Sequence, residues 1–292
     1  MTLEATASRD LILQIRGLAK AFPGVQALAG IDLDVRRGEI HAVMGENGAG
    51  KSTLMRILAG LERADSGQLS LDGRPSRFRQ PLDALRAGIV MIHQELLPFP
   101  NLTVAENLFL GQLPSRGVPG WLDGAALRRQ ARAALAQLGA EIAPETRMGQ
   151  LRIAETQLVE IARALVHDAR VLILDEPTSA ISDREVEVLF GILRDLRSRG
   201  VAILYISHRM EEIFRLADTI TVLRDGQLVA TKPAKAWNPA SLVTAMVGRA
   251  MAPPTPSTPP PAGDPLLTLH GLGRRGAFAD VNLELRRGEV LG

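Results

Sequence analysis

The segment from Gly45 to Ser52 constrains the fold of this chain more than any other part of its sequence. It fits the pattern G-x-x-x-x-G-K-[ST], and its residues are Gly45, Glu46, Asn47, Gly48, Ala49, Gly50, Lys51 and Ser52. An apolar run at residues 40–43 precedes it, and a helical pattern at residues 51–61 follows it. A strand, a glycine-rich turn and a helix in this order form a phosphate-binding loop. The sequence therefore predicts such a loop inside an α/β fold.

Each residue type in this loop suits a nucleotide phosphate. Glycines let backbone N–H groups approach phosphate oxygens closely, and the N-terminus of the following helix favours negative charge. We expect Lys51 to neutralise the β- and γ-phosphates and the Ser52 hydroxyl to ligate Mg²⁺. Thr53, the next residue, is expected to bind the nucleotide as well. The loop therefore predicts ATP and Mg²⁺ as cofactors.

Two acidic residues follow another apolar run. Residues 171–174 read Val-Leu-Ile-Leu, and Asp175 and Glu176 come directly after them. At the tip of a buried strand, Asp175 would hold the Mg²⁺ ion and Glu176 would polarise the attacking water as a general base. An ordinary turn at the end of a strand is the alternative. The phosphate loop upstream favours the catalytic interpretation.

Short apolar runs alternate with longer helical patterns along the first 250 residues. Continuous apolar runs indicate strands buried on both faces of a largely parallel sheet, and the alternation indicates βαβ crossovers. The expected strands are residues 12–15, 40–43, 89–92, 171–174, 201–206 and 220–223, and the expected helices are residues 51–61, 124–138, 154–166, 184–199 and 239–247. The strand pattern stops between residues 94 and 151, which predicts a helical subdomain, about residues 95–165, inserted into the core.

Composition excludes several classes of protein. The chain has no cysteine, so it can form neither a disulfide framework nor a thiolate metal site. Its formal net charge of +2 gives no electrostatic reason to expect a nucleic-acid partner. The first residues lack a signal-peptide pattern, and no apolar run approaches the roughly 20 residues of a transmembrane helix. We therefore expect a cytoplasmic protein that contacts a membrane only through a partner.

The order of these motifs resembles that of ATP-binding cassette (ABC) ATPases over residues 11–250. The resemblance implies a P-loop NTPase of the ABC type, with a mostly parallel sheet, flanking helices and an N-terminal antiparallel β portion. It implies that Phe22 stacks on adenine, that Gln94 ligates Mg²⁺, and that His208 contacts the γ-phosphate and helps to fix the water. Without the resemblance, Phe22 would be an ordinary core residue and His208 a structural cap after a strand. The implied catalytic residues are Lys51, Glu176 and His208.

The signature segment departs from the family pattern. Where the family usually has Leu-Ser-Gly-Gly-Gln, this chain has Leu151-Arg152-Ile153-Ala154-Glu155. In the family, the serine and the glycine backbone bind the γ-phosphate held by an opposite domain. The long fork of Arg152 cannot reproduce a close backbone approach. We therefore expect this signature to be degenerate; the alternative is that Ala154 and Glu155 begin an ordinary helix.

The end of the chain repeats its beginning. Residues 281–290 match residues 31–40, and residues 267–272 match residues 13–18. The intervening segment is rich in proline, which indicates an extended, semi-rigid linker, although a disordered tail has a similar composition. We therefore expect a nucleotide-binding domain at residues 1–250, a linker at residues 251–265 and the truncated start of a second such domain at residues 266–292.

Several phrases, among them MIHQEL and YISHRMEEIF, resemble the tandem-cassette ATP-binding subunits of ribose-, galactose- and xylose-type importers. The resemblance implies an ATPase that energises import of a simple sugar. Its partners would be membrane permease subunits, a second ABC domain (the missing half or another copy) and, indirectly, an extracytoplasmic sugar-binding protein. It would lie at the inner face of the cell membrane.

Two alternative functions remain open on the sequence. One is a non-catalytic or truncated ATP-binding module that needs a second cassette, which the signature and the incomplete repeat favour. The other is a soluble ABC protein that acts on ribosomes or DNA rather than in transport. The short insertion between Lys51 and Leu151 and the nearly uncharged linker disfavour the second alternative.

Overall fold

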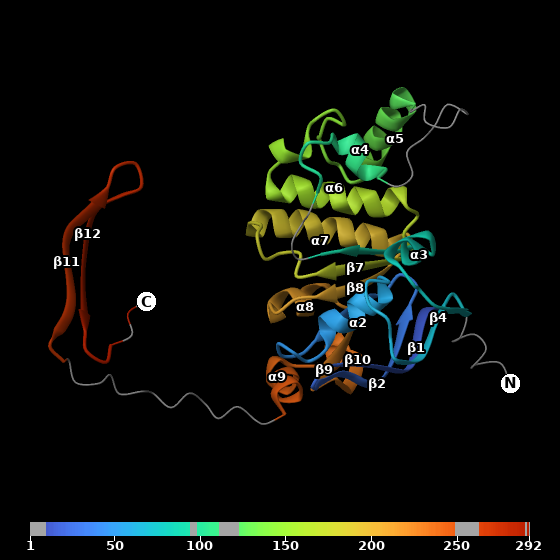
Figure 1. The fold of residues 1–292 in the computed structure, drawn as a ribbon, viewed down its shortest axis with the longest axis horizontal. Helices are drawn as coiled ribbons and strands as arrows, with labels where there is room; N and C mark the ends of the chain where they lie inside the picture. The colour runs from blue at the N-terminus through green and yellow to red at the C-terminus, as the bar shows by residue number, and fades with distance from the viewer. Residues whose placement is uncertain (1–9, 94–97, 111–122, 249–262, 290, 292) are drawn as a thin grey trace. The chain divides into compact units, whose positions relative to one another are not determined.

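The computed structural model describes residues 10–93, 98–110, 123–248, 263–289 and 291. The chain divides into two compact units, Met1–Ala250 and Met251–Gly292 (Figure 1). The larger unit contains two sheets and all the described helices, and the smaller unit contains one hairpin.

A six-stranded sheet forms the centre of the larger unit. Its order is β10-β9-β3-β8-β7-β6, where five neighbouring strands are parallel and β10 is antiparallel to β9. The strands are β3 (Ile40–Met44), β6 (Ile89–Ile92), β7 (Val171–Asp175), β8 (Ala202–Ile206), β9 (Thr219–Arg224) and β10 (Gln227–Pro233). Every residue of β3 and β8 is buried. The prediction of a mostly parallel sheet is confirmed, and its apolar runs mark strands that are covered on both faces.

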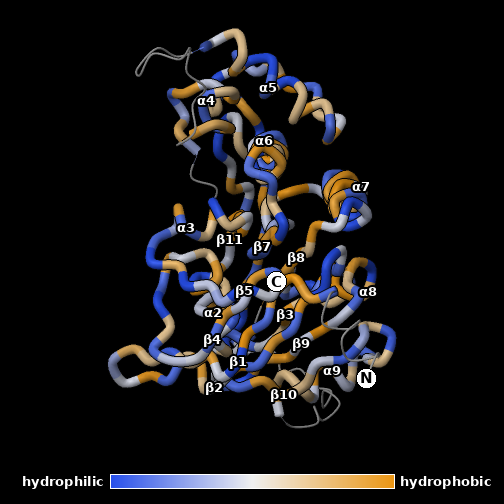
Figure 2. The backbone as a smooth tube through the Cα atoms, turned by 90° about the vertical axis from the view of Figure 1, so that its right-hand side faces the viewer, coloured by the Kyte–Doolittle hydropathy of each residue, from blue (hydrophilic) through white to orange (hydrophobic). Residues whose placement is uncertain are grey.

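Two apolar clusters cover the two faces of this sheet. Ala42 and Met44 of β3 belong to one cluster, and Val43, between them, belongs to the other. This alternation is the two-residue period of a strand with an apolar layer on each side. Figure 2 shows the hydrophobic residues of β3, β7 and β8 gathered in the interior. On one side lie α6 (Ile153–Val166), α7 (Asp183–Ser198) and α8 (Met210–Leu216), and on the other lies α2 (Lys51–Leu58).

An antiparallel sheet packs beside α2, as expected for the N-terminal part of the fold. Its strands are β1 (Leu11–Phe22), β2 (Val25–Arg36), β4 (Ser66–Leu71) and β5 (Arg74–Ser76), in the order β2-β1-β4-β5. Leu13 and Leu28 from this sheet share an apolar cluster with Leu54 of α2. β1 and β2 meet at a tight turn where Phe22 pairs with Val25. The sheet thereby holds this hairpin turn beside the start of α2.

In the described part of the segment after β6, helices replace strands. They are α4 (Val104–Leu108), α5 (Gly124–Gln137) and the 3-10 turn η1 (Met148–Gln150), and α6 follows. Thr103 begins α4 by accepting a hydrogen bond from the backbone N–H of Glu106 at 3.2 Å, and Asp123 caps α5 in the same way. Leu127, Ala131 and Leu135 bury one face of α5. Helices α3 (Pro81–Arg86) and α9 (Pro239–Val247) complete the unit.

The smaller unit is a two-stranded hairpin that repeats the geometry of β1 and β2. Strand β11 (Pro265–Arg274) pairs with β12 (Phe278–Arg286) in antiparallel register. Leu272 lies opposite Val281, and the matching residues Leu18 and Ile31 lie opposite each other in β1 and β2. Most of the proline-rich segment lies outside the described residues. Among the described residues, no helix is both long and apolar enough to cross a membrane.

A buried carboxylate anchors the amino end of β3. Glu39 accepts a hydrogen bond from the backbone N–H of Arg36 at 2.7 Å, and His41 Nδ1 lies 3.4 Å from its Oε1. Burial acts to raise the pKa of Glu39, but the hydrogen bonds from His41, Thr219 and Arg36 outweigh it and lower the pKa to about 2. Glu39 therefore stabilises the fold in its charged form, at the end of β3 that is remote from the phosphate loop.

The acid stability of the protein tests this assignment. Since the folded pKa lies below the ordinary 4.5, the stabilisation is present above pH 4.5 and is lost as the pH falls towards 2. We expect Glu39→Gln to cost on the order of 2–3 kcal/mol at pH 7 and less at pH 3. Urea unfolding at both pH values measures this difference. An equal cost at both values would contradict the assignment.

Candidate functional site

The glycine-rich segment forms the connection between β3 and α2. Lys51, the first residue of α2, turns back over the loop, and its Nζ donates hydrogen bonds to the carbonyl oxygens of Gly45 (2.7 Å) and Glu46 (2.8 Å). An ammonium group has three N–H donors, so a third remains for a ligand oxygen. The loop itself thus holds the Lys51 ammonium in place beside the N-terminus of α2, where anions are favoured.

Two glycines of the loop are required by close backbone contacts. A Cβ atom on Gly45 would lie 2.3 Å from the carbonyl oxygen of Leu223 in β9, and one on Gly50 would lie 2.5 Å from that of Ala27 in β2. Gly50 also has a φ of 100°, in the region that side chains disfavour. A Cβ on Gly48, by contrast, would meet nothing within 4 Å. Backbone atoms of both sheets therefore pack closely against the two ends of the loop, whereas no atom packs closely against its middle at Gly48.

Asp175 and Glu176 lie where β7 ends, beside this loop. Burial raises the pKa of Asp175, and the Glu176 carboxylate adds to this, while His93 and Lys51 act in the opposite direction. Burial likewise lowers the pKa of Lys51, and the charges of Glu176 and Asp175 oppose that change. Lys51, Asp175 and Glu176 all line one cleft, so the ammonium and the two carboxylates act on one another through their charges.

Glu176 adopts a backbone conformation that is unusual for its residue type. Its φ is 47°, and its N–H donates to the carbonyl oxygen of Ile206 at the end of β8 (2.9 Å). Residues other than glycine rarely adopt positive φ values, and such strain clusters at functional sites. His208, just after β8, places its Nδ1 3.4 Å from Oε2 of Glu176. Its side chain is 67% exposed. The acid and the histidine therefore face each other across neighbouring strand ends.

A cleft of about 440 Å³ gathers most of the predicted site residues. Its lining consists of Phe22, Val25, Ala27, Asn47, Gly48, Gly50, Lys51, Ser52, Thr53, Asp175, Glu176 and Ile206. Gly45, Glu46, Ala49 and His208 do not line it, and Gln94 lies outside the described residues. Phe22 is 39% exposed at the turn between β1 and β2, so it is not an ordinary core residue. A flat apolar ring at the mouth of this cleft can stack on a base.

Sequence reasoning missed three residues of the cleft. Val25 faces Phe22 across the hairpin turn, and Ala27 lies two residues further along β2. Ile206 ends β8 next to Asp175 in the parallel register. The pairing of the hairpin strands could have indicated Val25, because residues flanking a tight turn lie opposite each other. Ala27 and Ile206 carry no signal that distinguishes them from other apolar residues.

The cleft offers few protein ligands for a metal ion. The described residues contain no group of three or more His, Asp or Glu side chains arranged to hold a metal. The Ser52 hydroxyl and the Asp175 carboxylate both line the cleft and are hard oxygen donors. Mg²⁺ is typically bound by one or two such ligands together with phosphate oxygens and water. The residues present therefore fit Mg²⁺ that enters with a nucleotide.

The signature segment lies at the start of α6, outside this cleft. Arg152 precedes the helix, and its backbone N–H donates to Oε2 of Glu155 at 2.8 Å. The Glu155 carboxylate thus satisfies a backbone donor at the same helix N-terminus. Ile153, between them, is exposed. This helix start is capped by its own acidic side chain.

Comparisons with known proteins show which family the chain is similar to. Residues 28–179 match the sequence profile of a family described as ABC transporter. A ribose import ATP-binding protein of Rubrobacter xylanophilus is 50% identical over 281 residues, which cover 96% of this chain and 54% of that protein. A protein of Burkholderia ambifaria named for ribose/galactose/methyl galactoside import is 51% identical over 284 residues, which cover 96% of this chain and 54% of that protein. The chain spans about half the length of these curated relatives.

Solved structures agree on the fold. A crystal structure of an ATP-binding cassette of an ABC transporter, in its ADP conformation, has a TM-score of 0.69 and 26% sequence identity. The match covers 82% of this chain and 99% of that chain. A dimeric structure of a bacterial ABC transporter cassette has a TM-score of 0.65 at 23% identity, and covers 76% of this chain and 99% of that one.

Alanine substitutions in the loop test how tightly it is held. We expect Gly50→Ala to lower the free energy of unfolding by about 2–5 kcal/mol, because the new Cβ meets Ala27 and the φ is positive. Gly48→Ala, which shares only the positive φ, should cost about 1 kcal/mol. Urea unfolding of the two variants measures the difference, and equal losses would contradict the close contact.

Proposed function

Because this chain belongs to the ABC transporter family, we propose that it binds and hydrolyses ATP to energise import of a simple sugar. The observation that carries the proposal is the single cleft that joins the phosphate loop, Asp175 and Glu176, with His208 beside Glu176. Relatives named for ribose and galactose import support the sugar class. The hairpin of the smaller unit, which repeats β1 and β2, supports a second cassette as a partner.

The cleft provides for binding of the nucleotide. The ring of Phe22 would stack on the adenine at the mouth of the cleft. Backbone N–H groups of the loop and the N-terminus of α2 would receive the phosphates, and Lys51 would neutralise the β- and γ-phosphates. Ser52 and Asp175 would hold Mg²⁺, which offsets negative charge on the phosphate oxygens when it is bound. Gln94 is proposed as a further ligand of the ion.

Hydrolysis would take place at the end of the cleft near Glu176. Its carboxylate would accept a proton from water as the water oxygen bonds to the γ-phosphorus. The bond from that phosphorus to the bridging oxygen would break, and ADP would leave with the electron pair. His208, 3.4 Å from Glu176, would hydrogen-bond to the γ-phosphate and limit the position of the water. Lys51 would stabilise the charge that develops on the bridging oxygen.

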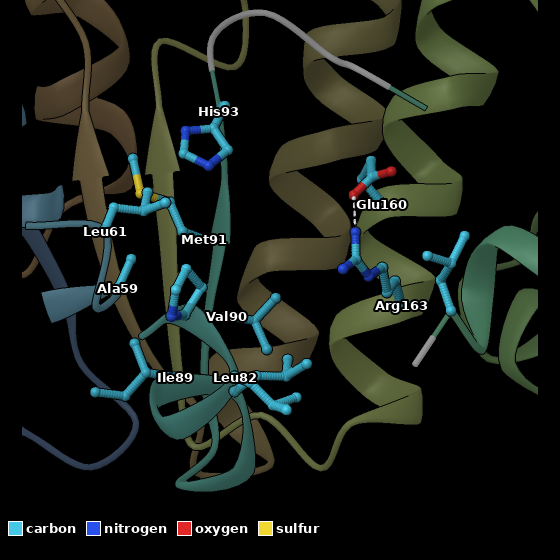
Figure 3. Close-up of a pocket in the computed structure, with 12 residues that line it drawn as sticks. Ala59, Leu61, Leu82, Ile89, Val90, Met91, His93, Glu160 and Arg163 are labelled. Atoms are coloured by element: carbon cyan, nitrogen blue, oxygen red, sulfur yellow. Dashed lines mark hydrogen bonds and ion pairs between the residues drawn. The ribbon is translucent and has the colours of Figure 1, made fainter. Parts of the chain in front are cut away.

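A second hollow supports a membrane permease as a partner. It has a volume of about 360 Å³ and lies between the end of α2, α3, β6 and α6 (Figure 3). The apolar floor of the hollow is formed by Leu61, Leu82 and Val90. Its charged wall is an ion pair in which Nη1 of Arg163 lies 3.4 Å from Oε2 of Glu160. Leu61 is partly exposed there. An amphipathic helix of a permease would bury an apolar face on this floor and present polar groups to that wall.

A non-catalytic ATP-binding module is the second candidate function. The observation in its favour is the start of α6, where Glu155 already accepts from the backbone N–H of Arg152. A helix N-terminus capped by its own carboxylate is a poor site for a further phosphate. In this alternative the chain binds ATP through Lys51 but hydrolyses it only when another cassette supplies a signature.

Nucleotide assays separate the two candidates. We expect Glu176→Gln to keep ATP binding and to lower kcat by about 10²–10⁴-fold, since it removes the general base. Lys51→Ala should weaken ATP binding by about 10–100-fold, since it removes charge-assisted hydrogen bonds. Calorimetry with ATP and phosphate release at several protein concentrations measure both. Binding without release at any concentration would favour the non-catalytic module.

Membrane sedimentation tests the permease contact. We expect Leu61→Asp to weaken association with membranes from cells that co-express the permease by about tenfold or more, because an apolar contact of about 1.5–3 kcal/mol is lost. Val188→Asp, on an exposed position of α7 outside the hollow, is the matched control and should bind as the parent does. If Leu61→Asp and the parent bind these membranes equally, the hollow is not the contact site for the permease.

A further inference from the structure

Glu212 is a carboxylate that is almost completely buried in the first turn of α8, with 3% of its surface exposed. Its Oε2 accepts hydrogen bonds from the hydroxyls of Thr178 (2.8 Å), Tyr205 (3.0 Å) and Ser207 (3.0 Å). Its Oε1 lies 2.8 Å from Nη1 of Arg209. Burial of a carboxylate is unfavourable unless partners of this kind satisfy it. Four side chains therefore compensate the buried charge of Glu212.

Three of the four partners of Glu212 lie in the two loops that carry Glu176 and His208. Thr178 lies two residues after Glu176, in the loop that follows β7. Ser207 and Arg209 lie immediately before and after His208, in the loop that follows β8. A single oxygen atom, Oε2 of Glu212, thus binds both loops at once. Tyr205 is the only hydroxyl partner that belongs to neither loop, since it lies within β8.

The loop after β8 needs this anchor because packing alone does not fix the His208 side chain. The His208 side chain is 67% exposed, so its place depends on the backbone on either side of it. Ser207 Oγ also accepts from the backbone N–H of Arg209 at 3.0 Å, which closes the loop around His208. On the other side, Gln157 of α6 donates to the carbonyl oxygen of Pro177 at 2.7 Å. The loop after Glu176 is therefore tied to α6 as well as to Glu212.

We propose that Glu212 is a positioning residue that sets the distance between Glu176 and His208 by binding both of their loops. It touches no nucleotide and takes no part in proton transfer. It acts through the backbone, so its loss would misplace two side chains together and leave the phosphate loop unchanged. This role rests on the proposed function for its effect on hydrolysis, but its effect on the loops does not depend on hydrolysis.

Hydrogen exchange measured by mass spectrometry on the full chain tests the anchoring directly. We expect Glu212→Gln to raise amide exchange about tenfold or more in peptides covering both residues 176–182 and residues 205–212, because the neutral amide cannot satisfy three hydroxyls and a guanidinium together. Thr178→Val should loosen the first peptide more than the second, and Ser207→Ala the second more than the first. These two variants keep the test valid if Glu212→Gln does not fold.

Two variants serve as controls. Tyr205→Phe removes a hydrogen bond to the same Oε2 atom but from the sheet, and should leave exchange in both loops unchanged. Glu39→Gln removes a buried carboxylate at the amino end of β3, away from both loops. It should lower global stability without a selective rise of amide exchange in either loop. If Glu212→Gln matches Glu39→Gln in both loops, the anchoring role is wrong.

Steady-state kinetics test the consequence for hydrolysis. We expect Glu212→Gln to lower kcat by about 10–100-fold and to change the KM for ATP by less than about threefold, because misplacement of catalytic groups affects the reaction rather than binding. Loosened loops with an unchanged kcat would overturn the positioning role. If the parent chain shows no turnover, the proposed hydrolysis fails, and the exchange data alone decide whether Glu212 holds the loops.

Discussion

Burial of the central sheet on both faces is the constraint on which the site depends. Strands β3, β8 and β7 are neighbours and parallel, so their carboxyl ends lie at one edge of the sheet. The loop after β3 leads into Lys51 at the start of α2, the loop after β7 begins with Glu176, and the loop after β8 carries His208. Pairing of these strands sets their register, so that Lys51 and Glu176 line one cleft and His208 Nδ1 lies 3.4 Å from Oε2 of Glu176. The geometry of the cleft is therefore a consequence of the order of the strands.

The sequence predicted the elements whose signal is local. Strand β6 and helix α9 have the expected bounds, because the first is a short apolar run and the second has a capping Asn238 before Pro239. Helix α2 ends at Leu58, three residues earlier than expected, because Gly60 adopts a left-handed conformation with φ of 71°. Strands β4 and β10 were not expected, since neither is a continuous apolar run: β4 is ordered by pairing with the distant β1, and β10 by pairing with the adjacent β9 across a two-residue turn.

The residues of the candidate site also divide into those with a local sequence signal and those without one. The phosphate loop and the acids after β7 could be read from the sequence, because their spacing to a strand and a helix is short and their residue types are restricted. Glu212 could not be recognised, because its partners lie up to 34 residues away and only the neighbouring positions of β7 and β8 bring them together. A buried carboxylate on a short helix has no local pattern. Such a network forms only when strands that are distant in the sequence pair, so it becomes visible only in the folded structure.

The charges in the cleft support the proposal that the nucleotide binds together with a divalent cation. Burial removes hydration from the charged forms of both groups, which raises the pKa of Asp175 and lowers that of Lys51. Their mutual attraction opposes these shifts, but two carboxylates face one ammonium. A polyphosphate adds further negative charge, which a divalent cation between Ser52 and Asp175 would offset. In the proposed function, ion and nucleotide would therefore bind together, and Glu176, whose backbone N–H donates to the carbonyl oxygen of Ile206, would accept the proton of the water.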